Sequence, residues 1–182
     1  MAERLEISDA ACLRPLRAAD APELHALIEG NRDRLARWLD WAAAQSFDDT
    51  VDFIRRAEAQ LAANEGFQAA LVEAGAIAGV VGHTGVDWRR RSTALGYWLD
   101  ERHEGRGLMT LAVGALVDHS LRAWGLNRVE VRAAVGNRRS RAVVERLGFR
   151  HEGTLREAER VGERYLDSAV YGMLAEEWAG DP

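Results

Sequence analysis

The chain has 182 residues, 47% hydrophobic and 29% charged, which is typical of one soluble globular domain spanning residues 1–182. Its net charge of −5 disfavours a nucleic-acid-binding protein, because phosphate contacts need a basic surface. The only cysteine, Cys12, excludes an intrachain disulfide and a four-cysteine metal site, and no bound metal is expected. No apolar run approaches the roughly eighteen residues of a membrane span, and no signal peptide is recognised, so the cytoplasm is the expected location.

The N-terminal part of the chain predicts one strand and two helical segments. Residues 11–17 have the composition of a strand. Asp20, with Glu23 three residues later, has the pattern of a capping box and predicts the start of a helix. A short helical run follows with Trp38 and Trp41, which are three residues apart and are therefore expected on one side. These two indoles belong either to the core or to the wall of a substrate cleft.

A third helix and a β-hairpin come next. The helix is expected to begin at Asp48 or Asp49, and its apolar residues recur with the helical period. Residues 67–73 and 77–87 flank an Ala-Gly turn and predict the two strands of the hairpin. His83 lies in the second strand, where a core or surface histidine is more common than a substrate contact.

Residues 95–110, LGYWLDERHEGRGLMT, predict a strand, a loop and the start of a helix. The first N–H groups of a helix have no partner within the helix, and the helix dipole favours negative charge there. Gly105 and Gly107 allow the backbone to approach a phosphate with no Cβ in the way. Three side chains add positive charge to this loop: Arg102, His103 and Arg106. The stretch therefore predicts a binding site for a pyrophosphate group.

The rest of the chain predicts helices and strands in alternation. Helices are expected over residues 108–124 and 138–147, with a strand over residues 127–135 between them. Residues 149–157 and 165–173 predict a final antiparallel pair. Together these elements predict one α/β (α+β) domain with a mixed, largely antiparallel sheet.

Phosphate loops between a strand and a helix also occur in proteins that bind NAD or ATP. The dinucleotide motif G-x-G-x-x-G would need glycine where the sequence has Thr110. That fold also requires an acidic residue near the end of the next strand, whereas Glu130 lies near its start. A Walker A loop needs lysine, and the sequence contains none. NAD and ATP are therefore disfavoured ligands.

The loop and two later motifs resemble one protein family. Residues 102–107, RHEGRG, match the R/Q-x-x-G-x-G/A acetyl-coenzyme A loop of the GCN5-related N-acetyltransferases, or GNAT proteins. Asn137-x-x-Ser140 and the LGF of residues 147–149 resemble the branch of ribosomal-protein N-terminal acetyltransferases of the RimJ/RimL type. The resemblance implies an enzyme that transfers an acetyl group from acetyl-CoA to a primary amine. It also implies a twisted sheet with splayed central parallel strands and helices on both faces.

The resemblance assigns the cofactor, acetyl-CoA, to the region between the splayed strands. Backbone groups of Trp98 and Leu99 would bind the pantetheine arm, the loop would surround the pyrophosphate, and Asn137 would reach the pantetheine. The implied acetyl-CoA-binding residues are Trp98, Leu99, Arg102, His103, Glu104, Gly105, Arg106, Gly107, Thr110, Asn137 and Ser140.

The resemblance also implies two catalytic residues. Ser140 is the candidate that assists the leaving thiolate, because Val144 stands where many relatives outside the RimJ/RimL branch carry a tyrosine. Glu159 matches a glutamate of that branch and is the candidate base, acting through water. Many family members carry an acid on the strand before the loop, where this chain has Ala94. In a regular strand Glu157 would lie on the same face as Glu159 and could replace it.

The acceptor cleft has four candidate residues, Trp38, Trp41, His83 and Tyr165, each of which could instead be packing. The resemblance implies the N-terminal α-amine of a protein, such as a ribosomal protein beginning with Ser or Ala. A small amine, such as an antibiotic, a polyamine or an amino acid, is the alternative acceptor. A third interpretation is a non-catalytic coenzyme-A-binding module, since the two departures noted above remove expected catalytic groups. A monomer and a homodimer are both compatible with the resemblance.

Overall fold

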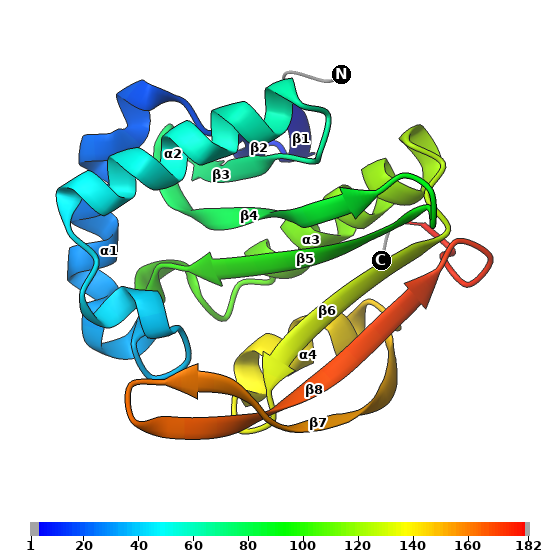
Figure 1. Cartoon of the computed structure of the whole chain (residues 1–182). Coiled ribbons are helices and arrows are strands. Elements are labelled where there is room, and N and C mark those ends of the chain that lie inside the picture. Colours follow the sequence, from blue (N-terminus) through cyan, green and yellow to red (C-terminus); the bar gives the residue numbers. More distant parts are fainter. Residues whose placement is uncertain (1–3, 181–182) are drawn as a thin grey trace.

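The computed structural model describes residues 4–180 and forms one eight-stranded sheet with four α-helices (Figure 1). The strand order is β1-β2-β3-β4-β5-β6-β8-β7. Among these described strands, β5 and β6 are the one parallel pair, and the other neighbours are antiparallel. A single α+β fold with a mixed, largely antiparallel sheet is therefore confirmed.

The strands are β1 Leu5–Ser8, β2 Ala11–Pro15, β3 Gln68–Glu73, β4 Ala76–Asp87, β5 Ser92–Leu99, β6 Arg128–Ala134, β7 Arg150–Val161 and β8 Arg164–Leu174. The α-helices are α1 Ala21–Leu35, α2 Phe47–Ala62, α3 Leu108–Asp118 and α4 Arg138–Arg146. Short 3₁₀ turns are Ala18–Asp20, Asp40–Ala43 and Glu101–His103, and a π turn, His119–Ala123, extends α3. Within residues 4–180 no helix is long and apolar enough to cross a membrane.

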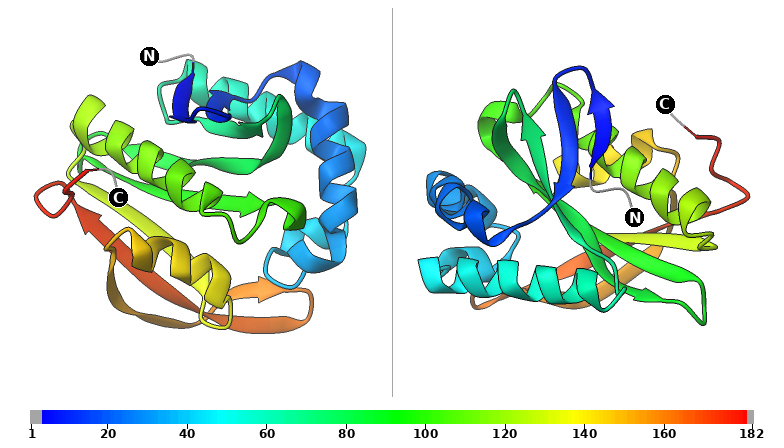
Figure 2. Two further views of the ribbon diagram at one scale, coloured as in Figure 1. Left: turned by 180° about the vertical axis from the view of Figure 1, so that it is seen from behind. Right: turned by 90° about the horizontal axis from the view of Figure 1, so that it is seen from above.

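Helices cover both faces of the sheet, as expected (Figure 2). On one face α1 and α2 bury an apolar cluster that includes Leu24, Ile54 and Val80. On the other face α3 and α4 cover a larger cluster that includes Leu116 and Val129. Burial of these side chains supplies the main favourable contribution to folding and holds the central strands from both sides.

The two parallel strands separate part-way along their length. β5 pairs with β6 from Ser92 to Leu95, opposite Arg128 to Val131. Beyond these residues β5 continues to Leu99 beside β4 alone, and β6 continues beside β8 alone. The predicted splay is therefore present (Figure 1). We call the space between the separated ends the β5–β6 gap. In this gap each of the two strands lacks a strand partner, among the described residues, on the side facing the other.

Several predicted boundaries differ from the structure. β1 was not expected, α2 begins after the cap residue Ser46, and Trp38 lies in a turn before the 3₁₀ segment. The capping box predicted at Asp20 is wrong. The Asp20 carboxylate instead accepts two hydrogen bonds from Arg14, at 2.7 and 2.8 Å. The Glu23 carboxylate accepts one from the Ile77 N–H at 2.6 Å. Both carboxylates join α1 to the sheet, which is a contact that local sequence does not encode.

Candidate active site

The loop between β5 and α3 has the backbone geometry of an anion site. Gly105 and Gly107 have φ angles of 76° and 75°, in the left-handed region that favours glycine. A Cβ on either residue would meet no atom within 4 Å, so the backbone is accessible. Among the described residues, the N–H groups of 105–107 donate no hydrogen bond, and the first turn of α3 begins at Leu108. These free donors at a helix N-terminus fit a diphosphate.

Asp100 fixes the start of this loop. Its buried carboxylate accepts hydrogen bonds from Asn31 Nδ2 at 2.7 Å, His103 Nδ1 at 2.8 Å and Arg102 Nε at 2.9 Å. Burial alone would raise the pKa of Asp100, but these hydrogen bonds outweigh it and hold the pKa below its usual value. The charged Asp100 carboxylate therefore stays in place and holds the loop against α1.

The cationic side chains of the loop are paired with carboxylates. Arg106 lies 2.7 Å from Glu73, and Arg102 pairs with Asp100 as described. Glu104 forms ion pairs with Arg34 at 2.6 Å and with Arg139. Because a phosphate would compete with these carboxylates, the free backbone N–H groups are the stronger part of the site. The Glu104 side chain joins the loop to α1 and α4.

Two α1 residues that support the loop were not among those predicted from the sequence. Asn31 is buried, donates to Asp100 and accepts from the Glu101 N–H at 3.0 Å. Arg34 pairs with Glu104 and donates to the carbonyl oxygen of Leu99. A polar residue on the buried face of a predicted helix is the signal that could have identified Asn31. Its partner 69 residues away has no signature in the sequence.

The first turn of α4 lies across the β5–β6 gap. Asn137 caps the helix, since its Oδ1 accepts from the Ser140 N–H at 3.2 Å. Tyr97 Oη donates to the Ser140 carbonyl oxygen at 2.8 Å and accepts from Ser140 Oγ at 3.4 Å. Burial raises the pKa of Tyr97 to about 12, so its phenol is neutral at physiological pH. The backbone of Ser140 is therefore held at this gap by the Asn137 cap and by Tyr97.

The acidic residue beside Ala94 does not resemble a base. Ala94 pairs in register with Glu130 on β6, whose carboxylate accepts hydrogen bonds from Arg128 at 3.0 Å and Arg132 at 2.8 Å. Burial would raise the pKa of Glu130, but the two arginines outweigh it and lower the pKa. Glu130 therefore remains charged and paired with the two arginines.

Both candidate tryptophans lie at the gap. The Trp41 ring is 6.4 Å from the ring of Trp98 on β5, measured between centroids, and 39% of Trp41 is exposed. The Trp38 ring lies 3.3 Å from the position a Cβ would take on Gly136, just before α4. Trp41 therefore lies beside β5, and Trp38 lies beside the segment between β6 and α4. This arrangement favours a cleft wall over a place in the core.

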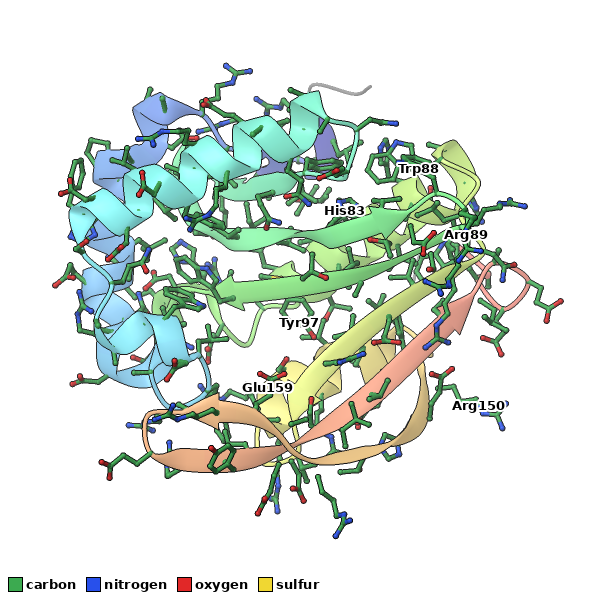
Figure 3. All side chains as sticks on the ribbon, viewed as in Figure 1. His83, Trp88, Arg89, Tyr97, Arg150 and Glu159 are labelled. Atoms are coloured by element: carbon green, nitrogen blue, oxygen red, sulfur yellow. The ribbon has the colours of Figure 1, made fainter. Side chains whose placement is uncertain are left out.

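The β7–β8 hairpin carries Glu159 and Tyr165, and both are exposed. Glu159 has no ion-pair partner between residues 4 and 180, and Figure 3 shows it on the side of the hairpin toward Tyr97. The regular strand on which the predicted equivalence of Glu157 and Glu159 depends is not present. β7 bulges here: Glu157 has φ of 50° and its N–H donates to Asp167 Oδ1 at 2.9 Å.

The tip of this hairpin is attached to the segment that follows α1. The Gly162 N–H donates to Asp40 Oδ1 at 2.8 Å, and Arg164 donates to the carbonyl oxygen of Arg37 at 3.4 Å. These contacts join residues more than a hundred positions apart and place the hairpin beside the segment that carries both candidate tryptophans (Figure 1). We call this contact the hairpin dock.

His83 does not lie in the acceptor cleft, so that assignment is wrong. Its side chain is fully buried, and its Nε2 lies 3.0 Å from Ser120 Oγ. The ring packs against Phe67 and Trp124, with centroids 4.9 and 4.7 Å away. Burial lowers the pKa of His83 to about 4, so the imidazole is neutral. It is a core residue, which was the more common case for such a histidine.

Comparison with known proteins shows the family. A family model described as an acetyltransferase (GNAT) domain matches residues 11–150. The chain belongs to this family. The matched residues include the loop, the β5–β6 gap and the start of α4.

Individual relatives are similar to this chain in sequence or fold over nearly its whole length. The putative ribosomal N-acetyltransferase YdaF of Bacillus subtilis (strain 168) is 35% identical over 178 residues, covering 97% of each chain. RimL, a ribosomal L7/L12 α-N-protein acetyltransferase solved with coenzyme A, has a TM-score of 0.91 at 26% identity, covering 94% of this chain and 98% of that one. The microcin C7 self-immunity acetyltransferase MccE, solved with acetyl-CoA and AMP, has a TM-score of 0.89 at 26% identity, covering 96% and 97%. The resemblance to RimL-type GNAT acetyltransferases is confirmed.

Substitution of Gly107 tests the loop. We expect Gly107→Ala to raise the KM for acetyl-CoA about tenfold, because a displaced N–H loses a charge-assisted hydrogen bond. Gly125→Ala is the matched control, since Gly125 follows the other end of the α3 helical segment with φ of 63°. Both variants should lose similar stability from left-handed strain, and only Gly107→Ala should change KM. Equal KM values in the two variants would contradict a phosphate site at this loop.

The buried His83 predicts a pH-dependent stability. Its pKa is about 4 when folded and 6.5 in the reference state, so the unfolded chain binds an extra proton between these values. Stability is therefore lost as the pH falls through this window. Because of this difference in the pKa of His83, we expect the free energy of unfolding to fall by about 2 kcal/mol when the pH is lowered from about 7 to about 5. Urea denaturation at each pH measures the change. His83→Gln should remove this component, whereas His151→Gln, on an exposed residue of β7, should retain it.

Proposed function

We propose that this GNAT acetyltransferase uses acetyl-CoA to acetylate the N-terminal α-amine of a protein in the cytoplasm, such as a ribosomal protein beginning with Ser or Ala. The observation that carries the proposal is the β5–β6 gap, which leads from the free N–H groups of the loop to Ser140. Similarity to YdaF over 97% of both chains and to RimL in fold supports a ribosomal acceptor.

In this proposal the loop and gap hold acetyl-CoA, which supplies an acetyl thioester to an attacking amine. The N–H groups of residues 105–107 and the first turn of α3, including Thr110, bind the diphosphate. The β5 edge at Trp98 and Leu99 has no strand partner in the gap among the described residues, and the Leu99 carbonyl oxygen there is occupied by Arg34. The Asn137 amide nitrogen has no partner within residues 4–180. This amide and the remaining backbone groups of the β5 edge are available to the amides of the pantetheine arm.

Two side chains then act on protons. A protein α-amine is largely protonated at neutral pH, so attack requires that a base remove a proton. Glu159 supplies this base through a water molecule, and its lack of an ion-pair partner among the described residues leaves the carboxylate available. Ser140 Oγ donates a hydrogen bond to the leaving sulfur, which stabilises its negative charge. Trp38, Trp41 and Tyr165 form the acceptor cleft.

A small amine remains the second candidate acceptor. MccE, whose structure contains AMP beside acetyl-CoA, has nearly the same fold at 26% identity. This fold therefore also occurs in a protein solved with a small molecule besides acetyl-CoA, and an assay distinguishes the two acceptor classes.

The acceptor assay measures free-thiol release from acetyl-CoA with two sets of amines. One set contains short peptides with free Ser, Ala or Met N-termini, and the other contains aminoglycosides, polyamines and single amino acids. We expect release with the peptides, with mass spectrometry showing acetylation of the α-amine. Release with small amines alone would contradict the protein acceptor. A melting temperature raised by coenzyme A without release from either set would support the non-catalytic module.

Removal of the proposed base should slow turnover. We expect Glu159→Gln to lower kcat at least about a hundredfold, which is the lower end of the contribution of a general base. Glu163→Gln, on the exposed turn of the same hairpin, is the matched control and should retain the wild-type rate. Steady-state kinetics with the best peptide gives the comparison. An unchanged kcat in Glu159→Gln would exclude this residue as the base.

A further inference from the structure

Tyr97 lies in the part of β5 that has separated from β6 (Figure 3). The side chains of Leu95, Tyr97 and Leu99 alternate with the others of the strand and face α3 and α4. The ring packs against the core on this face, and its hydroxyl is the group that reaches α4. A strand residue thereby contacts a helix 43 positions later, across the space assigned to the pantetheine arm.

The Tyr97 hydroxyl makes both of its hydrogen bonds to one residue. It donates to the Ser140 carbonyl oxygen at 2.8 Å and accepts from Ser140 Oγ at 3.4 Å. The shorter contact anchors the phenol to the first turn of α4. The longer contact is near the limit of a hydrogen bond, so the serine hydroxyl is oriented but can turn to a stronger acceptor at little cost.

Ser140 has no other means of orienting its hydroxyl. Its N–H is held by the Asn137 cap, and between residues 4 and 180 Tyr97 is the one partner of its Oγ. Val144, one turn later in α4, is buried and apolar and cannot form a hydrogen bond with the serine hydroxyl. Without the phenol, the serine side chain would be free to rotate among its staggered conformations.

We propose that Tyr97 is a positioning residue that holds the Ser140 hydroxyl at the gap, from where its O–H turns to the leaving sulfur. This inference rests on the proposed function of Ser140. The phenol transfers no proton: its O–H remains on the Ser140 carbonyl oxygen, and its lone pair accepts the single serine O–H at 3.4 Å only until the sulfur, a stronger acceptor as it becomes charged, takes over that hydrogen bond. The serine hydroxyl then donates a hydrogen bond to the sulfur as negative charge develops there. Burial raises the pKa of Tyr97 to about 12, which keeps the phenol in this form across the working pH range.

A double-mutant cycle tests whether Tyr97 acts through Ser140. We expect Tyr97→Phe to lower kcat about tenfold, with KM for acetyl-CoA within about twofold of wild type. Ser140→Ala should lower kcat further, and adding Tyr97→Phe to it should produce no additional loss. Losses that multiply in the double variant would overturn the proposal, since they would show that Tyr97 acts independently of the serine.

Tyr171→Phe is the matched control. The Tyr171 hydroxyl also joins α4 to the sheet, through Arg141 at 2.7 Å and Glu145 at 2.6 Å, and it has no contact with Ser140. If Tyr97 only stabilises α4, Tyr171→Phe should reproduce its effect on kcat. We expect instead that both variants lower the melting temperature and that only Tyr97→Phe lowers kcat.

A binding measurement provides a readout that is independent of turnover. Coenzyme A and desulfo-coenzyme A differ only at the sulfur, so the ratio of their dissociation constants reports contacts to that atom. At mildly alkaline pH, where part of the thiol is ionised, we expect wild type to prefer coenzyme A about tenfold. Tyr97→Phe and Ser140→Ala should each abolish the preference. A preference retained in Tyr97→Phe would overturn the proposal, whereas failure of both ligands to bind wild type would instead contradict the proposed function.

Discussion

The separation of β5 from β6 is the constraint on which the rest of the site depends. Backbone N–H and C=O groups in the interior of a sheet normally pair, and leaving them free costs stability. The chain maintains the separation because each strand keeps its outer neighbour, β4 or β8, and because helices pack on both faces. The Tyr97 hydroxyl ties the separated part of β5 to Ser140 on α4, the helix that follows β6. A pantetheine arm with amide groups of its own fits the unpaired edges.

The loop shows how one group of residues combines rigidity and binding. Asp100 holds the loop to α1, and Glu104 holds it to α1 and α4 through Arg34 and Arg139. These ion pairs occupy the cationic side chains, while the backbone donors at Gly105 and Gly107 remain free. Rigid, uncompensated dipoles aimed at one place bind an anion without first having to reorganise. The side-chain charges mainly keep the loop in this shape.

Local signals predicted the elements of the site, and long-range contacts determined how its side chains function. The glycines of the loop and the Asn137 cap depend on backbone conformation within a few residues, so sequence was sufficient to find them. Asn31 and Tyr97 act through partners 69 and 43 positions away, and neither partnership leaves a pattern in the sequence. The β7 bulge invalidated an argument from strand alternation, because an irregular residue shifts the faces of all residues beyond it.

The hairpin dock has a consequence for which amines can reach the site. Hydrogen bonds from Gly162 to Asp40 and from Arg164 to Arg37 join the hairpin to the segment after α1, so the two border the gap as one unit. A free chain end is narrow, whereas a side-chain amine on a folded surface brings bulk that would meet this border. The choice of acceptor would then depend first on the width of the segment that carries the amine, and only afterwards on the identity of its amino acids.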